Sequence, residues 1–452
     1  MEASYGFLSI VPLLLMIISA IVTKRIIESA ILATLVAFVI TDKWNFFFAW
    51  VDGLQAEVAN FAYFFVLFCS IGALIKLVIK SNSIQGFAQI CTRFIKGRKS
   101  ALLVTWIAGI IIFADDYLNA LGVGTSMRAI TDKYRVSREF LSYVVNSTGA
   151  VVCMLVPVSS WGAFLVSQID LYPVTGNSMA DFISSMPYMF YCWAALLIVP
   201  LFIFGVIPLF GKMKKAERRA IETGEVFPAS GKKSDYAESA DLAENAQKVG
   251  KARDFIIPML VFVVLGIIWG NIPYAGVVAI AVCALLYLPT KTLTPGEFFD
   301  AVIEGCKDMV FVIVLLVFVF LVATCGNNMG ASDYIISIIG PLMLPKLLPF
   351  ATFLGVSLLA IGTGSFWGSA AIALPIFLQL CNAGGGNPYV VFGAAASAIA
   401  LASHISFWND GVTVTCAACE IDNADYSATV TPLLCIPIAL ACIGYLVLGF
   451  VM

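Results

Sequence analysis

Apolar segments near 20 residues in length, separated by shorter polar stretches, occupy most of this sequence. A run of about 20 apolar residues is the length that an α-helix needs to cross the hydrocarbon core of a bilayer. The segments expected to cross are 5–22, 26–41, 61–79, 140–161, 186–210, 255–269, 274–288, 309–325 and 389–403. Two other apolar segments, 101–124 and 349–380, are interrupted by polar or glycine-rich runs. The pattern predicts an all-α polytopic membrane protein.

Composition excludes the class of soluble proteins. Of the 452 residues, 61% are hydrophobic and only 12% are charged, whereas about 25% are charged in soluble domains. The 12 cysteines lie mostly in apolar segments without paired spacing, so neither a disulfide framework nor a zinc site is expected. The expected partners are the lipid bilayer and a small ion or solute, with no nucleic acid, and a homodimer is compatible with the sequence.

The positions of the basic residues predict the topology. The first apolar segment is followed by Lys24 and Arg25 rather than preceded by positive charge, which predicts a retained helix with its N-terminus outside. Two basic clusters, 93–99 and 128–138, are both expected in the cytoplasm, yet only the segment 101–124 lies between them. A full crossing would put the clusters on opposite sides. The segment is therefore predicted to form a re-entrant hairpin with its tip near 114–117.

One hydrophilic stretch divides the chain. Residues 211–254 carry ten lysines and arginines and eight aspartates and glutamates, so they cannot lie in lipid. The predicted domains are a first membrane repeat, 1–210, a charged cytoplasmic linker, 211–254, and a second membrane repeat, 255–452. Because the first repeat starts outside and the second starts inside, the repeats are expected to be inverted, with both termini extracytoplasmic in the cell membrane.

Weak internal matches support this division. The run 48–53 resembles 298–305, Ser159-Ser160-Trp161 resembles Ser406-Phe407-Trp408, and 168–170 resembles 420–422. Each half is predicted to contain a re-entrant hairpin and a broken transmembrane helix. Interrupted segments at matching places are typical of secondary transporters and indicate their binding sites.

Asp115 and Asp116 are the strongest candidates for a functional site. Carboxylates inside an apolar segment are costly unless they face a polar cavity or a partner. Two adjacent carboxylates repel, so one of them is expected to accept a proton near neutral pH while the other stays charged. Sodium prefers such hard oxygen ligands, and competition between sodium and protons would give exchange. The alternative is a structural pair that sits at an interface or binds Arg128.

Other polar and aromatic groups fall at the predicted hairpin tips and helix breaks. The alternative for each serine and threonine is a hydrogen bond between helices, and for His404 a fixed hydrogen-bonding role rather than titration. The complete candidate set for ion or substrate binding is Asp115, Asp116, Asn119, Asn146, Ser147, Thr148, Ser159, Ser160, Trp161, Thr363, Ser365, Trp367, His404, Ser406, Asn409 and Asp410.

Three runs carry a resemblance to a known family: Ile-Phe-Ala-Asp-Asp-Tyr-Leu-Asn at 112–119, the basic stretch 127–138, and Val-Pro-Val-Ser-Ser-Trp at 156–161. They resemble the NhaC family of sodium/proton antiporters in the ion-transporter superfamily. The second half fits more loosely at 362–368 and differs from the family at 407–410. The resemblance implies hairpins and broken helices that meet at the bilayer midplane, sodium/proton antiport by alternating access, sodium at Asp115 and Asp116, and no cofactor beyond that ion.

Aromatic residues at the breaks are compatible with a second class of function. Trp161, Phe366, Trp367, Phe407 and Trp408 all fall at the breaks, and aromatic walls suit an organic ligand. The alternative is therefore a sodium- or proton-coupled exchanger of small organic acids or amino acids. An intramembrane protease is disfavoured, because a chain with one histidine has no His-Glu-x-x-His motif, and no enzyme activity is expected.

Overall fold

The computed structural model describes residues 5–23, 25–170, 174–228, 230, 250–269, 271–331, 334, 337, 345–363, 366–384, 386–406 and 409–451. Every regular element in these ranges is a helix. Within the same ranges, six helical stretches are long and apolar enough to cross a membrane, or seven if one bent pair counts as a span. The predicted all-α polytopic fold is confirmed.

The helices of residues 1–223 are α1 Val11–Thr23, α2 Ile26–Asp42, α3 Phe46–Asn60, α4 Ala62–Lys80, α5 Ser83–Thr92, α6 Arg98–Ile111, α7 Asp116–Lys133, α8 Arg138–Thr148, α9 Ala150–Leu155, α10 Ser160–Asp170, α11 Ser178–Ser185, α12 Phe190–Phe204 and α13 Gly211–Thr223. Those of the remainder are α15 Ala252–Trp269, α16 Ile272–Tyr287, α17 Pro295–Asp308, α18 Val310–Asn328, α20 Leu348–Thr363, α21 Phe366–Gly384, α22 Pro388–Ile405, α23 Asp410–Cys419 and α24 Asn423–Val451.

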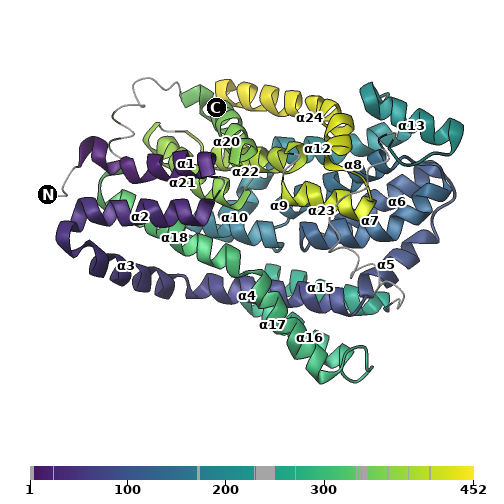
Figure 1. Ribbon diagram of the computed structural model, residues 1–452, viewed down its shortest axis with the longest axis horizontal. Coiled ribbons are helices and arrows are strands. Elements are labelled where there is room, and N and C mark those ends of the chain that lie inside the picture. Colours follow the sequence, from purple (N-terminus) through teal and green to yellow (C-terminus); the bar gives the residue numbers. More distant parts are fainter. Residues whose placement is uncertain are drawn as a thin grey trace.

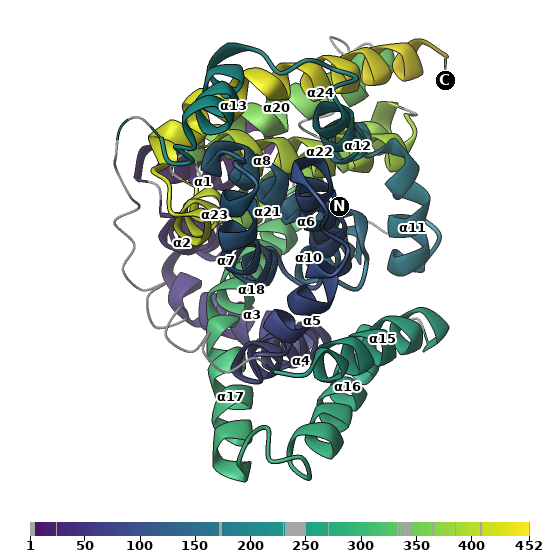
Figure 2. The ribbon, with the colours of Figure 1, turned by 90° about the vertical axis from the view of Figure 1, so that its right-hand side faces the viewer.

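The helices are arranged in layers. Helices α4, α15, α16 and α17 lie on one side of the molecule, and α12, α13, α20 and α24 lie on the opposite side (Figures 1 and 2). Between them lie α6 to α10 and α21 to α23, which contain the first predicted hairpin, one arm of the second and the helix breaks. The candidate site therefore falls in the middle layer.

In the layer of α4, α15, α16 and α17, the helices α4 and α17 cross at close distance. A Cβ atom on Gly72 would collide with the carbonyl oxygen of Gly305, and the reverse also holds. Small residues allow this approach of two helix backbones in a membrane. Beside the crossing, Lys76 Nζ lies 2.8 Å from a carboxylate oxygen of Asp308, so the two halves of the chain are tied together here.

The predicted hairpin at 101–124 is present as α6 and α7, which turn back at residues 112–115. Its two ends meet at one carboxylate: Arg98 at the start of α6 forms an ion pair with Glu217, and the Ser137 amide after α7 donates to Glu217 Oε1 over 2.8 Å. A straight crossing could not bring both ends together. The turn comes slightly earlier than 114–117, because Asp115 caps the N-terminus of α7.

The second half contains a corresponding pair, α20 and α21, on either side of residues 364–365. A Cβ atom on Gly355 of α20 would lie 3.2 Å from the Phe377 ring of α21, so the two arms lie side by side. Figure 1 places α6 and α7 toward one end of the long axis and α20 and α21 toward the other. The predicted inversion requires such an arrangement, and the inversion itself stays a prediction.

Both halves also contain a broken helix. In the first, α9 ends at Leu155 and α10 begins at Ser160; in the second, α22 ends at Ile405 and α23 begins at Asp410. Pro157 has no amide to donate, and Ser159 Oγ accepts the Gly162 amide over 2.8 Å as the cap of α10. A further break at Gly149, between α8 and α9, was not predicted.

The start of the predicted linker is a folded helix. Helix α13 packs on the first half, where Arg219 pairs with Glu139 over 2.9 Å and the Arg138 amide donates to the Val226 carbonyl over 2.9 Å. Residues 229 and 231–249 of the linker lie outside the described ranges. The division at 1–210, 211–254 and 255–452 stays a prediction.

Candidate functional site

Asp115 is fixed at the start of α7 by three donors. Its Oδ1 accepts the backbone amides of Tyr117 and Leu118 over 3.0 and 3.1 Å, and its Oδ2 accepts the Ser160 hydroxyl over 2.8 Å. The side chain is 5% exposed. A short polar residue with these contacts is a helix N-cap, and here the cap also joins the hairpin tip to α10.

Asp116 faces the other half of the protein. It is 6% exposed, and its Oδ2 lies 3.5 Å from the position that a Cβ on Gly411 would take. The same position lies 3.1 Å from Asn409 Oδ1 and 4.0 Å from the Phe366 ring. The second aspartate therefore stands where α7 meets the starts of α21 and α23, whereas the first aspartate serves the local fold.

The hairpin tip is held by further hydrogen bonds. The Ser160 amide donates to the Ala114 carbonyl over 2.9 Å, and the Cys153 thiol lies 3.1 Å from the Phe113 carbonyl. Asn119 Nδ2 donates to the carbonyls of Gly109 and Ile112, at 2.6 and 2.9 Å. Its Oδ1 is buried and accepts no hydrogen bond within the described part of the chain.

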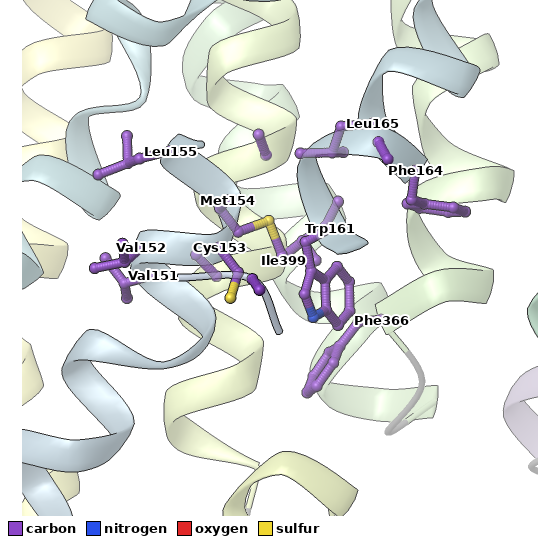
Figure 3. Close-up of a cluster of buried hydrophobic side chains, with 14 of the residues drawn as sticks. Val151, Val152, Cys153, Met154, Leu155, Trp161, Phe164, Leu165, Phe366 and Ile399 are labelled. Carbon is purple, nitrogen blue, oxygen red and sulfur yellow. The ribbon is translucent and has the colours of Figure 1, made fainter. Parts of the chain in front are cut away.

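Aromatic rings close the other side of this meeting point. Trp161 stacks on Trp367 with ring centroids 4.2 Å apart and planes 12° apart, and its ring centroid lies 5.5 Å from that of Phe366. Phe164 meets Trp367 edge to face. Figure 3 shows the indole nitrogen of Trp161 on the ring edge nearest Phe366, with Cys153 of α9 on the same side.

Four helix N-termini converge through these contacts. Asp115 and Ser160 join the starts of α7 and α10, and the stacked tryptophans join the starts of α10 and α21. Gly411, near the start of α23, approaches Asp116 and Phe366. Helix N-termini carry partial positive charge, so four such partial charges lie around the two aspartates.

Asn146, Ser147, Thr148 and His404 are all buried, and two of them, Asn146 and His404, belong to a neighbouring polar cluster. Asn146 Nδ2 donates to the Tyr426 hydroxyl over 2.6 Å, and the Tyr191 hydroxyl lies 2.9 Å from His404 Nδ1. Thr148 donates within its own helix, and its carbonyl accepts from Asn119. His404 Nε2 has no hydrogen-bond partner in the described ranges, and the choice between titration and a fixed hydrogen-bonding role stays a prediction.

The remaining predicted residues divide into three groups. Ser159 caps α10, and Asn409 caps α23 through the Gly411 amide at 2.7 Å. Ser406 is buried at the second break, and its hydroxyl has no hydrogen-bond partner in the described ranges. Ser365, Phe407 and Trp408 lie outside the described residues, as do the side chains of Thr363 and Asp410.

One form of the structural alternative pairs the aspartates with Arg128, but Arg128 binds a different carboxylate. Its guanidinium binds Glu420 over 2.9 Å, and Arg138 binds Asp132 over 2.7 Å. Both ion pairs lie away from the hairpin tip, at the far end of α7 and at the end of α23. Among the described residues, no group of three or more His, Cys, Asp or Glu side chains could hold a metal ion.

Sequence reasoning missed Cys153, Gly411, Tyr191 and Tyr426. Gly411 had a usable signal, because a glycine directly after a polar helix start allows close approach of a neighbour. The two tyrosines had none, since their hydrogen bonds reach partners on distant segments.

Comparison with known proteins shows a family for this chain. A family model described as the Na+/H+ antiporter family matches residues 152–450, more than half of the chain. An uncharacterized protein of Haemophilus influenzae is 26% identical over an alignment of 488 positions, gaps included, that covers 98% of this chain and 91% of that protein.

Two solved structures have a similar fold. MtrF of Neisseria gonorrhoeae, one of a class of antimetabolite efflux pumps, is 14% identical with a TM-score of 0.53, over 89% of this chain and 85% of MtrF. The YdaH transporter of Alcanivorax borkumensis is also 14% identical with a TM-score of 0.53, over 87% of this chain and 86% of YdaH. At this identity the likeness concerns the fold.

Proposed function

We propose that this chain, which belongs to the Na+/H+ antiporter family and is a secondary transporter of the membrane, exchanges sodium for protons by alternating access. The observation that carries the proposal is the pair of buried carboxylates at the point where the helix breaks of both halves meet. Ionisable groups at membrane depth mark ion pathways.

The two aspartates have different proposed roles. Asp115 already accepts three hydrogen bonds, so it orients the tip and adds negative charge. Asp116 faces α23 and α21, so it is the carboxylate proposed to exchange sodium for a proton. Asn119 Oδ1, one helical turn along α7, is a buried acceptor that supplies a neutral oxygen ligand. Hard oxygen donors of this kind suit an alkali cation.

Competition at one carboxylate gives the coupling. Sodium favours the ionised form of Asp116, whereas a proton removes the charge that holds sodium. Because Asp116 lies between the hairpin tip and α23, its occupant changes the electrostatic attraction between parts of the two halves. Discontinuous helices that enclose such a site are typical of alternating access.

The test is sodium-driven proton flux in proteoliposomes that contain the purified protein and a pH-sensitive dye. Asp116→Asn keeps the size of the side chain and removes its charge and proton, so exchange is expected to be lost. Asp115→Asn retains a good helix cap and is expected to keep more activity than Asp116→Asn.

Asp300→Asn is the matched control, because Asp300 is an exposed aspartate on α17. Its exchange is expected to equal that of the unmodified protein. Wild-type exchange with unchanged pH dependence in Asp116→Asn would overturn the proposal.

A further inference from the structure

A cavity of about 590 Å³ lies beside the C-terminal end of α24. Its walls come from the 3-10 turn η6 Pro345–Leu347, the starts of α20 and α22, the end of α24 and Val174. Figure 1 shows the end of α24, marked C, next to α20 at the upper edge of the molecule. None of the described lining residues belongs to the candidate set for ion binding, so the proposed exchange leaves this cavity without a role.

The walls of the cavity are fastened to one another. A Cβ atom on Gly449 of α24 would collide with the Lys346 carbonyl oxygen, so η6 lies directly on α24. Another part of the wall is held by Asp181 of α11, which accepts the Val174 amide over 2.8 Å and the Tyr389 hydroxyl over 3.3 Å. These contacts keep the cavity open in a fixed shape, as is usual for a ligand site.

One wall of the cavity continues into a surface that faces lipid. Helix α24 is long and apolar enough to cross the membrane, and Leu440, Ile443 and Val447 form an exposed row along it. Exposed apolar side chains on a membrane span face the hydrocarbon. Leu448, the residue after this row, lines the cavity. The cavity therefore lies next to acyl chains, at the end of a span.

The polar side of the cavity is positive. The Lys346 ammonium lies 6.0 Å from the centroid of the exposed Phe450 ring. Aromatic residues at the end of a span lie at the level of the lipid headgroups, and lysine side chains extend to the same level. Helix α22 begins at Pro388, so its positive N-terminus also borders the cavity. The nearby Asp181 is 1% exposed and accepts four hydrogen bonds.

We propose that this cavity binds one glycerophospholipid molecule of the bilayer. The lipid phosphate contacts Lys346 and the N-terminus of α22, and part of one acyl chain packs on Leu348 and Leu448. A soluble phosphate lacks the chain and a neutral lipid lacks the phosphate, so neither uses both sides of the cavity. The inference is independent of the ion exchanged at Asp116. Because the cavity joins the base of the second hairpin to α22 and α24, the bound lipid would fasten that base.

The first experiment is titration of the purified full-length protein in detergent, with bound molecules counted by native mass spectrometry. The probes are palmitoyl-oleoyl-phosphatidylglycerol, the diacylglycerol with the same two chains, and glycerol phosphate without chains. The tightest phospholipid is expected to bind at one molecule per chain. The diacylglycerol is expected to bind about tenfold or more weakly, because it loses the contacts of a phosphate with a lysine and a helix N-terminus. Glycerol phosphate is expected not to bind.

The second experiment locates the lipid with two variants. Lys346→Gln removes the ammonium and is expected to weaken phospholipid binding by about fivefold, whereas Lys307→Gln, on the exposed surface of α17, is the control. Leu448→Trp fills the cavity and is expected to weaken binding of both lipids by about tenfold or more. Val447→Trp is its matched control, because Val447 is 55% exposed and belongs to the row that faces lipid. Both controls are expected to bind as the unmodified protein does.

Three results would each overturn the inference: unchanged phospholipid affinity in Leu448→Trp, equal affinities for the phospholipid and the diacylglycerol, and equally tight binding of glycerol phosphate. If Leu448→Trp does not fold, Lys346→Gln decides. Its preference for the phospholipid over the diacylglycerol is expected to fall by about fivefold, and an unchanged preference contradicts the phosphate contact. Sodium-driven proton flux is measured separately, so a failure of the proposed exchange leaves this result standing.

Discussion

Each half of the chain contains a helical hairpin, and the two hairpins differ in the chemistry of their tips. Helix α7 begins at Asp116 and is capped by Asp115, whereas α21 begins at Phe366 and Trp367. The charged tip is joined to α10 by a hydrogen bond of 2.8 Å, and the aromatic tip is joined to the same helix by stacked rings. The difference indicates that similar backbones can divide one site into a charged side and an apolar side.

The hairpins also differ in the packing around one glycine of each, Gly109 and Gly362, and Gly109→Ala tests this with the largest expected effect. A Cβ on Gly109 of α6 would collide with Thr148 of α8, whereas a Cβ on Gly362 of α20 meets nothing within 4 Å. Gly109→Ala is expected to destabilise the fold by about 1–3 kcal/mol. Thermal unfolding of the detergent-solubilised protein measures the change. Gly362→Ala is the control, and equal effects would contradict the difference in packing.

Ser160→Ala removes the hydrogen bond that joins the charged tip to α10. A hydrogen bond to a charged group contributes about 1.5–3 kcal/mol, so the sodium concentration for half-maximal exchange is expected to rise by about tenfold. Ser167→Ala on the same helix is the control. The Ser167 hydroxyl donates to the Phe164 carbonyl and accepts from Gln168 Nε2, and both partners belong to the same helix, α10. A similar rise in both variants would argue against a special role for Ser160.

Gly411→Ala places a methyl group between the two sides of the site. It would lie 3.1 Å from Asn409 Oδ1 and 3.5 Å from Asp116 Oδ2, so a bound cation would have less room. Exchange assays are expected to show a rise of a few fold in half-saturating sodium. Gly296→Ala on α17, where a Cβ meets nothing within 4 Å, should behave as the unmodified protein. An unchanged sodium dependence in Gly411→Ala would mean that the cation does not lie there.

Trp367→Phe has the smallest expected effect, since it keeps an aromatic partner for Trp161. An aromatic pair contributes about 0.5–1.5 kcal/mol beyond its buried area, and only part of that is lost. A slight fall in the thermal midpoint is the expected result. If the variant weakened sodium dependence as much as Ser160→Ala does, the division between a charged and an apolar tip would be wrong.

The sequence was sufficient for features that depend on local pattern. Two basic clusters around a single apolar segment predicted the hairpin of α6 and α7, and the apolar surroundings of Asp115 and Asp116 predicted that both are buried at its tip. The ion site itself stays a prediction. The sequence was insufficient for contacts between distant segments, such as Arg128 with Glu420 and Asn146 with Tyr426. Hydropathy reports how one segment meets lipid, and it contains no information on which polar groups pair across the fold.

The position of Glu217 on α13 has a consequence for biosynthesis. This carboxylate holds both ends of the first hairpin, yet it follows that hairpin by more than 80 residues. During translation the hairpin emerges before the group that fastens its base. The first hairpin therefore gains this contact only when α13 has left the ribosome and docked. A fragment that stops before residue 211 would contain both helices of the hairpin without the carboxylate that joins their ends.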